Sequence, residues 1–220
     1  MEYRKLGETE VEASVITFGA WATGGWMWGG ADRQDAVKAI RAAYNEGVTS
    51  IDTAPIYGMG VSEEIVAEAI DGIPRHKVQI LTKFGMRWDV KQGDFVMHSK
   101  DNYGKEIDIY KLASKESVIY EVEQCLRRLK TDYIDLFQLH WPDVTTPIAE
   151  TMEALGTLVK QGKIRAAGVC NYDTNQMKEA EQTIKLASDQ VRYSIIYRDI
   201  EKKLVPYCID NKKSIIAYSP

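Results

Sequence analysis

Four polar residues of this 220-residue chain have side chains suited to moving a proton: Asp52, Tyr57, Lys83 and His140. Each lies at or just beyond the C-terminal end of a short apolar run that predicts a β-strand. In a closed parallel barrel such strand ends meet on one face, where these folds carry their chemistry. The spacing therefore predicts one site that contains all four side chains.

The chemistry of each residue type indicates a role within such a site. A free phenol has a pKa of about 10, and a nearby ammonium group lowers it by stabilising the phenolate. Lys83 can supply that charge to Tyr57, and Asp52 on the neighbouring strand can compensate the buried ammonium. His140, at the end of another strand, can orient or polarise the group that receives the proton.

Each residue also has a purely structural interpretation. Asp52 and Lys83 could form an ordinary buried ion pair, and Tyr57 beside Gly58 could be a turn aromatic. His140 alone would more often be a core or rim histidine. The combination at adjacent strand ends favours the functional interpretation over these alternatives.

Short apolar runs alternate with helical periodicity along the chain, which is typical of a parallel α/β fold. Seven runs predict strands: 15–19, 49–52, 78–83, 133–140, 164–170, 189–193 and 214–219. Three segments predict helices: 32–46 with an Asp32 cap, 115–130, and 147–162 with a Thr146 cap. Cys125 lies on the apolar face of the second helix, so we expect it in the core. Before the first strand, segments 3–6 and 9–13 predict a hairpin that plugs one end of the barrel.

Two segments depart from a regular repeat. Phe84–Ser114 has no strong periodicity and follows Lys83 directly, so we expect a long functional lid or binding loop. The seventh strand ends near Pro220, whereas a (βα)8 barrel (TIM barrel) has eight. We therefore expect an α/β barrel that is incomplete at its C-terminal side, with an open edge beside the seventh strand, and a chain that belongs to a longer protein.

Composition and charge exclude several classes of function. The chain is long enough for one core, so we expect a single domain, 1–220. The net charge is -4 and no basic stripe is present, which argues against nucleic-acid binding. Three widely spaced cysteines without a CxxC predict neither a disulfide framework nor zinc, and favour a reducing cytoplasm. No signal peptide, membrane span or metal site is predicted.

Known nucleotide and nucleophile motifs are absent. The glycines at 24–30 and 58–60 do not complete a GxGxxG after a strand, which argues against a Rossmann site. The sequence has no P-loop and no GxSxG. A nicotinamide enzyme without a Rossmann motif remains compatible with these absences.

Several motifs resemble the aldo-keto reductase superfamily: 51–58 (IDTAPIYG), 81–84 (LTKF), 132–140 (DYIDLFQLH) and 168–171 (GVCN). The resemblance covers the chain from Tyr3 to Pro220. Through 140–143 (HWPD) and 26–29 (WMWG) it is similar to the bacterial general-stress and inositol-operon branch. It implies a (βα)8 barrel with an N-terminal hairpin, and an NADPH-dependent reduction of aldehydes or ketones with Tyr57 as general acid. The four residues above match the family's catalytic tetrad.

The resemblance also implies the residues that hold the cofactor NADP(H). Cys170, where serine is common, Asn171 and Gln190 match contacts to the nicotinamide carboxamide, and Tyr218, followed by Ser219, matches an aromatic that stacks on the ring. The family binds the 2′-phosphate with residues expected beyond Pro220, so the preference for NADPH over NADH rests on the family alone. Both residues also have a purely structural interpretation, in which Gln190 is a polar strand residue and Tyr218 is an aromatic of the barrel.

Five tryptophans follow predicted strands on the same face as the tetrad. Together they could form an apolar pocket for aromatic or aliphatic carbonyls. Trp21, Trp88 and Trp141 are the candidates, with Trp26 and Trp28 as further members. Each could instead pack beneath a loop. Arg198 and Glu201 match a pair common in this branch, and we interpret them as structural.

Two other functions remain open at this point. Some members of the superfamily act as cofactor-binding regulatory partners with little turnover. A Schiff-base aldolase that uses Lys83 as nucleophile is the other alternative. The sequence determines neither the substrate nor the oligomeric state.

Overall fold

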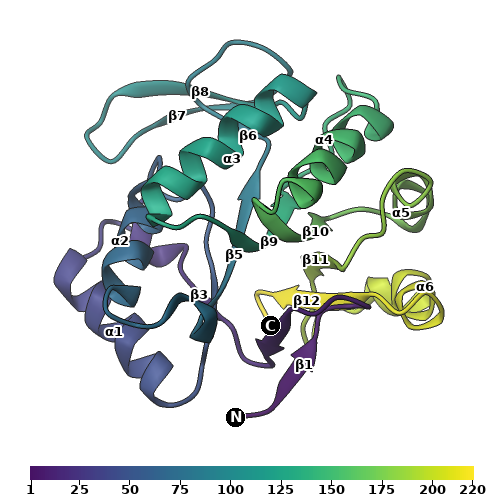
Figure 1. Cartoon of the computed structure of the whole chain (residues 1–220). Coiled ribbons are helices and arrows are strands. Elements are labelled where there is room, and N and C mark those ends of the chain that lie inside the picture. The colour runs from purple at the N-terminus through teal and green to yellow at the C-terminus, as the bar shows by residue number, and fades with distance from the viewer.

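The computed structural model describes all residues from Met1 to Pro220 and is built around one curled parallel sheet (Figure 1). Its seven strands are β3 (Phe18–Gly19), β4 (Ser50–Asp52), β5 (Gln79–Phe84), β9 (Ile134–Leu139), β10 (Ile164–Cys170), β11 (Ser188–Arg192) and β12 (Ser214–Tyr218). Their order in the sheet is β12-β11-β10-β9-β5-β4-β3, so each of these seven strands pairs with the next of the seven along the chain. The predicted α/β class and all seven predicted strands are confirmed. β3 and β12 form the two edges of the sheet.

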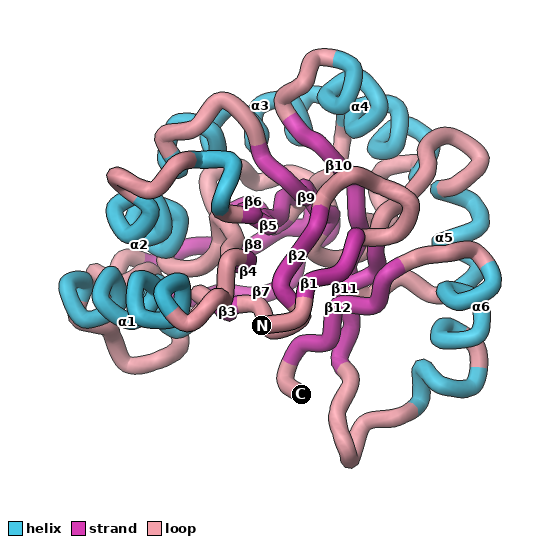
Figure 2. Tube along the Cα trace, turned by 60° about the horizontal axis from the view of Figure 1, so that its bottom comes forward, coloured by secondary structure: helices cyan, strands magenta, loops and turns pink.

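Helices cover the outer face of the sheet (Figure 2). They are α1 (Arg33–Asn45), α2 (Val61–Ile70), α3 (Lys115–Leu129), α4 (Ile148–Lys160), α5 (Thr174–Ala180) and α6 (Leu204–Asp210), with short 3-10 turns η1 (Ala22–Gly24), η2 (Arg75–Lys77) and η3 (Asp199–Lys202). The main hydrophobic core lies between these helices and the sheet and includes Cys125, as expected. None of the helices is long and apolar enough to span a membrane.

The predicted helix starts are correct with one exception. Asp32 caps α1 by accepting a hydrogen bond from the Asp35 N–H at 2.9 Å. The predicted Thr146 cap is wrong, because α4 follows Pro147 without a side-chain cap. The Thr146 hydroxyl instead donates to Asp143 at 2.7 Å. The buried carboxylate of Asp143 also accepts from the Thr145 hydroxyl and from two backbone N–H groups, and so competes for the capping hydroxyl.

The N-terminal hairpin closes one end of the curled sheet (Figure 2). Strands β1 (Tyr3–Lys5) and β2 (Glu12–Ser14) pair antiparallel. Apolar side chains of the hairpin region, Leu6, Val11 and Ala13, pack against Leu81, Leu136, Ala166 and Ala187 in the interior of the curl. The predicted plug is therefore confirmed, and the opposite end of the curl stays open.

The segment between β5 and α3 is a small sheet rather than a long loop. Strands β6 (Met86–Arg87), β7 (Asp94–Lys100) and β8 (Glu106–Lys111) pair antiparallel in the order β6-β8-β7. A register shift between Phe95 and Met97 interrupts the regular alternation of side chains. Short strands, the loops between them and this shift together leave Phe84–Ser114 without a long regular period. We call β6, β7 and β8 the antiparallel sheet below.

Candidate active site

Asp52, Tyr57, Lys83 and His140 meet at the open end of the curled sheet, where the sequence predicted them. Asp52 is the last residue of β4, Lys83 is the penultimate residue of β5, and His140 directly follows β9. The Lys83 Nζ lies 2.5 Å from Asp52 Oδ1, 3.3 Å from the Tyr57 hydroxyl and 3.1 Å from the Thr53 carbonyl oxygen. One ammonium group therefore joins the carboxylate to the phenol.

Lys83 is held as a buried cation. Its side chain is only 1% exposed. Burial alone would lower its pKa, but the adjacent Asp52 carboxylate and the Tyr57 oxygen raise the pKa of Lys83 above its usual value. The amine is thus protonated at neutral pH and serves as a fixed positive charge beside the phenol.

Tyr57 keeps its proton at neutral pH. Burial raises the pKa of the phenol, and the opposing attraction of Lys83 does not cancel this effect. The expectation that Lys83 brings the pKa of Tyr57 below that of a free phenol is therefore wrong, because removal from water outweighs one paired ammonium. The Tyr57 ring stacks on Trp21 at 5.8 Å between centroids and meets the His140 ring edge-on at 5.7 Å.

His140 is a neutral imidazole in this site. Burial, and then the positive charge of Lys83, bring its pKa well below the usual histidine value. A neutral imidazole carries one N–H donor and one acceptor nitrogen. The His140 backbone is fixed from both sides, because its N–H donates to the Phe84 carbonyl at 3.0 Å and its carbonyl accepts from Asn171 Nδ2 at 3.2 Å.

The residues expected to face the cofactor lie beside the tetrad. The Tyr218 hydroxyl donates to Asn171 Oδ1 at 3.0 Å, which fixes the orientation of the Asn171 amide. Gln190 Nε2 donates to Asp52 Oδ2 at 2.7 Å. Cys170 is buried, and burial raises the pKa of its thiol well above the usual value, so it stays neutral. The structure thus brings together the residues that the resemblance indicated from β10, β11 and β12.

These residues line one pocket of about 620 Å³. Its lining contains three tetrad residues, Asp52, Tyr57 and His140, together with the residues expected to contact the cofactor: Cys170, Asn171, Gln190, Tyr218 and Ser219. Its apolar wall includes Trp21, Trp26, Met27, Trp28, Ile56, Met86, Met97 and Trp141. The pocket has no lysine or arginine in its lining, since Lys83 lies behind Asp52 and Tyr57.

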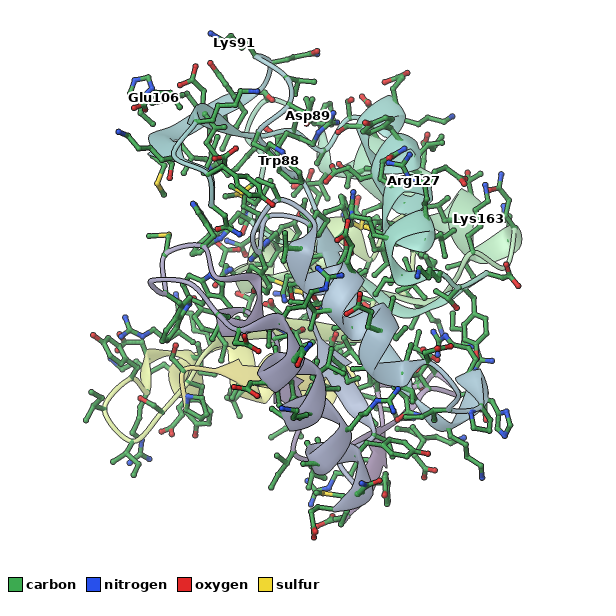
Figure 3. All side chains as sticks on the ribbon, turned by 90° about the vertical axis from the view of Figure 1, so that its left-hand side faces the viewer. Trp88, Asp89, Lys91, Glu106, Arg127 and Lys163 are labelled. Carbon is green, nitrogen blue, oxygen red and sulfur yellow. The ribbon has the colours of Figure 1, made fainter.

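Trp21 and Trp141 line this pocket as expected, whereas Trp88 does not. Trp88 follows β6 and packs against the hydrophobic cluster of Ile56 and Met86, beside the antiparallel sheet (Figure 3). The sequence analysis missed Met86 and Met97, which the antiparallel sheet brings to the pocket. Both methionines lie in Phe84–Ser114, the segment that the sequence predicted as a lid or binding loop. Methionines are common at adaptable binding surfaces, so they could have indicated this contribution to the pocket.

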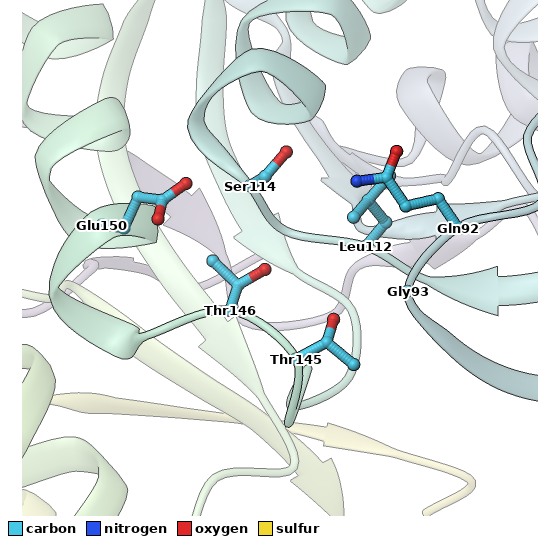
Figure 4. A pocket seen from close by; sticks show the side chains of 7 residues that line it. All are labelled: Gln92, Gly93, Leu112, Ser114, Thr145, Thr146 and Glu150. Carbon is cyan, nitrogen blue, oxygen red and sulfur yellow. The ribbon is translucent and has the colours of Figure 1, made fainter.

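A second, smaller pocket of about 240 Å³ lies away from the tetrad (Figure 4). Its lining is mostly polar and consists of Gln92, Gly93, Leu112, Ser114, Thr145, Thr146 and Glu150. Glu150 already accepts from the Lys115 N–H at 3.0 Å. No tetrad residue lines this smaller pocket, so the proton-transfer site is the larger pocket.

Arg198 and Glu201 form an exposed ion pair at 2.8 Å, and Tyr193 donates to Glu201 at 2.6 Å. These contacts hold the start of η3 in place, and neither residue of the ion pair lines the large pocket. The chain contains no group of three or more His, Cys, Asp or Glu residues that could hold a metal ion.

Comparisons with known proteins agree with this geometry. The model of the aldo/keto reductase family matches residues 15–220. The chain is 41% identical over 219 residues to "Aldo-keto reductase YhdN" of Bacillus subtilis (strain 168), covering 99% of this chain and 61% of that protein. It is 40% identical over 220 residues to the "NADH-specific methylglyoxal reductase" of Escherichia coli (strain K12), covering 98% of this chain and 66% of that protein.

A solved structure shows the same arrangement of elements. The glycerol dehydrogenase AKR11B4 from Gluconobacter oxydans superposes with a TM-score of 0.85 at 38% identity, over 98% of this chain and 62% of that one. The chain thus spans less than two thirds of the length of these three proteins. The family match across the parallel sheet, together with the tetrad at its open end, shows that the chain belongs to the aldo/keto reductase family.

Proposed function

We propose that this protein reduces aldehydes or ketones to alcohols with a nicotinamide cofactor. One observation carries the proposal: a buried ammonium, Lys83 Nζ, bridges Asp52 and the protonated Tyr57 on the floor of an apolar pocket. Reduction of a carbonyl requires hydride at carbon and a proton at oxygen, so a proton donor must reach that oxygen. Tyr57 is this donor.

Each residue of the tetrad has its own role in the proposed proton transfer. Tyr57 donates its hydroxyl proton to the carbonyl oxygen, and Lys83 stabilises the phenolate that forms. Asp52 compensates the charge of Lys83 before and after the transfer. The neutral His140 imidazole donates a hydrogen bond to the same oxygen and so helps to orient the carbonyl.

The residues beside the tetrad suit a nicotinamide ring. The amides of Asn171 and Gln190 offer hydrogen-bonding groups for a carboxamide, and Tyr218 offers an aromatic face. When bound, the cofactor supplies the hydride. Ser219 and the weak donor Cys170 would complete this side of the pocket. We propose NADP(H) from the family resemblance, and NADH is the other cofactor to test because the Escherichia coli relative is named as NADH-specific.

The pocket also indicates the kind of substrate. Its apolar wall is built from tryptophan and methionine, and no cation is available to pair with a carboxylate or phosphate. We propose that the carbonyl substrate is a small uncharged molecule with an aromatic or aliphatic body. A regulatory subunit would have no need of the intact proton donor. An aldolase would need an unprotonated Lys83, and the ion pair with Asp52 keeps this amine protonated.

Further proposals concern the whole protein. We propose that residues 1–220 form one domain and that their sheet is part of a (βα)8 barrel, which one more parallel strand between β3 and β12 would close.

The three cysteines are free and buried, which supports a reducing compartment such as the cytoplasm. We propose from its HWPD and WMWG motifs that the chain belongs to the bacterial general-stress and inositol-operon branch.

Substitution of Tyr57 by phenylalanine tests the proposed reaction. Tyr57→Phe keeps the ring that stacks on Trp21 and removes the proton donor. We expect kcat for carbonyl reduction to fall by about 10²- to 10⁴-fold, the usual contribution of a general acid. Tyr103→Phe, at a 90% exposed position, removes a hydroxyl outside the site and should leave kcat unchanged. The decrease in absorbance as NADPH or NADH is oxidised gives kcat for each variant. An unchanged kcat in Tyr57→Phe would contradict the mechanism.

A further inference from the structure

The side chain of Gln190 reaches across the interior of the curled sheet to the tetrad. Gln190 is on β11 and Asp52 is at the end of β4, and β10, β9 and β5 separate these two strands in the sheet. The two side chains nevertheless meet, with 2.7 Å between Gln190 Nε2 and Asp52 Oδ2. This hydrogen bond links the C-terminal part of the sheet to the Asp52 carboxylate of the tetrad.

The chemistry of the two groups fixes the direction of this bond. An ionised carboxylate can only accept hydrogen bonds, so Gln190 must present its NH2 group to Asp52 and turn its carbonyl oxygen away. Asp52 then uses one oxygen for Gln190 and the other for Lys83, at 2.5 Å. Lys83 in turn lies 3.3 Å from the Tyr57 hydroxyl. The result is a continuous chain of hydrogen bonds from Gln190 to the proton donor.

We propose that Gln190 is a positioning residue for proton transfer, which holds the Asp52 carboxylate in the orientation that places Lys83 against Tyr57. The inference rests on the proposed function and goes beyond a contact of Gln190 with the nicotinamide. The amide oxygen of Gln190 stays free to meet the cofactor, so the two roles are compatible and use opposite ends of the same side chain.

No neighbouring group can replace this donor. The charged or titratable side chains around Asp52, Lys83 and Tyr57 are His140 after β9 and Cys170 on β10, and both are neutral. No other side chain donates to Asp52 Oδ2. Without the Gln190 donor, the carboxylate charge is balanced by Lys83 alone. The ammonium is then drawn toward Asp52 and stabilises the phenolate of Tyr57 less.

Two substitutions separate positioning from cofactor binding. Gln190→Met keeps the length of the side chain and removes the donor. On the plateau below the alkaline limb we expect kcat to fall at least about tenfold, which corresponds to the loss of one hydrogen bond to a charged group. The alkaline limb of the kcat profile should move to higher pH, because the phenolate is less well stabilised.

Gln190→Glu gives a different pH dependence. When ionised, the introduced glutamate side chain repels Asp52, whereas a proton shared by the two carboxyl groups restores a donor to Asp52. We therefore expect kcat of Gln190→Glu to rise as the pH falls, while Gln190→Met stays low. Ser188→Ala is the matched control, because Ser188 is buried on the same strand and its hydroxyl has no hydrogen-bond partner. Its kcat profile should match that of the wild type.

The cofactor dissociation constant, from quenching of tryptophan fluorescence, is measured alongside kcat for each variant. A weaker cofactor affinity in Gln190→Met with an unchanged kcat profile would overturn the positioning role and leave the reductase function intact. An inactive wild type, with NADPH and with NADH, would instead overturn the proposed function on which the inference rests. A reduced kcat with a shifted alkaline limb in Gln190→Met, and recovery of Gln190→Glu at low pH, would support the inference.

Discussion

At the scale of single residues, the site depends on one buried cation that is fully engaged. The Lys83 ammonium is shared among a carboxylate, a phenol and a backbone carbonyl. Burial of an ammonium is tolerated only with such partners. Because these contacts occupy Lys83, the pocket in front of it offers no positive charge to a substrate.

Substitution of Met97 tests whether this lack of positive charge sets the substrate preference. We expect the wild type to reduce 4-nitrobenzaldehyde with a kcat/KM at least about tenfold higher than that for 4-carboxybenzaldehyde, which is similar in size but anionic. Met97→Arg, on the rim of the pocket and 37% exposed, should narrow this ratio by about fivefold, the scale of an interaction near the protein surface.

The matched control is Tyr103→Arg, which adds the same charge to the turn of the same hairpin but outside the pocket. Its ratio of kcat/KM values should equal that of the wild type. Equal wild-type kcat/KM values for the two aldehydes would show that charge plays no part in the selection of substrate.

At the scale of elements, the pocket wall depends on contacts between two segments distant in sequence. The Trp26 indole donates to the Lys100 carbonyl at 3.0 Å, and Asn102 Nδ2 donates to the Gly24 carbonyl at 2.8 Å. These bonds join the segment after β3 to the hairpin of β7 and β8. Both segments contribute side chains to the pocket, so we expect their relative position to control substrate affinity.

Trp26→Phe tests this coupling between the two segments. The phenyl ring keeps apolar contacts but cannot donate to Lys100. We expect KM for 4-nitrobenzaldehyde to rise about three- to tenfold, with less than about a twofold change in kcat, because the tetrad is untouched. Tyr110→Phe, which removes a hydroxyl from β8, is the control and should leave KM unchanged. A fall in kcat at constant KM would show that Trp26 acts on the chemistry instead.

At the scale of the whole molecule, the stability of the fold should depend on pH through Asp189. This residue on β11 is fully buried, and neither carboxyl oxygen pairs with a side chain. Only the backbone N–H groups of Asn171 and Tyr172 favour its charged form. Burial raises its pKa to about 8 from the ordinary value of 3.8. The folded state therefore retains a proton that the unfolded state releases, so this residue makes the free energy of unfolding decrease as the pH rises from about 4 to about 8.

Asp189→Asn should remove this pH dependence. The amide resembles the protonated carboxyl in size and carries no charge, so we expect the variant to be more stable than the wild type by about 2 kcal/mol or more at pH 8. The difference should shrink as the pH falls toward about 4. Urea denaturation followed by circular dichroism at several pH values measures it. Asp210→Asn, at an exposed position on α6, is the control, and its free energy of unfolding should follow that of the wild type at every pH. If the free energies of unfolding of the wild type and Asp189→Asn changed with pH in parallel, the prediction would be wrong.

The sequence alone determined the parallel α/β class, the seven strands, the hairpin plug and the residues of the tetrad. It could do so because these features depend on local periodicity and on strand ends, which are encoded by neighbouring residues. The position of Lys83 near the end of β5, for example, follows directly from the apolar run before it.

Only the tertiary structure decided the features that depend on distant segments. The bond between Gln190 and Asp52 joins residues 138 positions apart, and Met97 reaches the pocket through an antiparallel sheet with a shifted register. Trp88, which follows β6, lies outside the pocket because it packs against the hydrophobic cluster of Ile56 and Met86. The pKa of Tyr57 is raised because its burial outweighs its contact with Lys83. Burial and contacts across a barrel come from packing of the whole chain, which local sequence patterns do not specify.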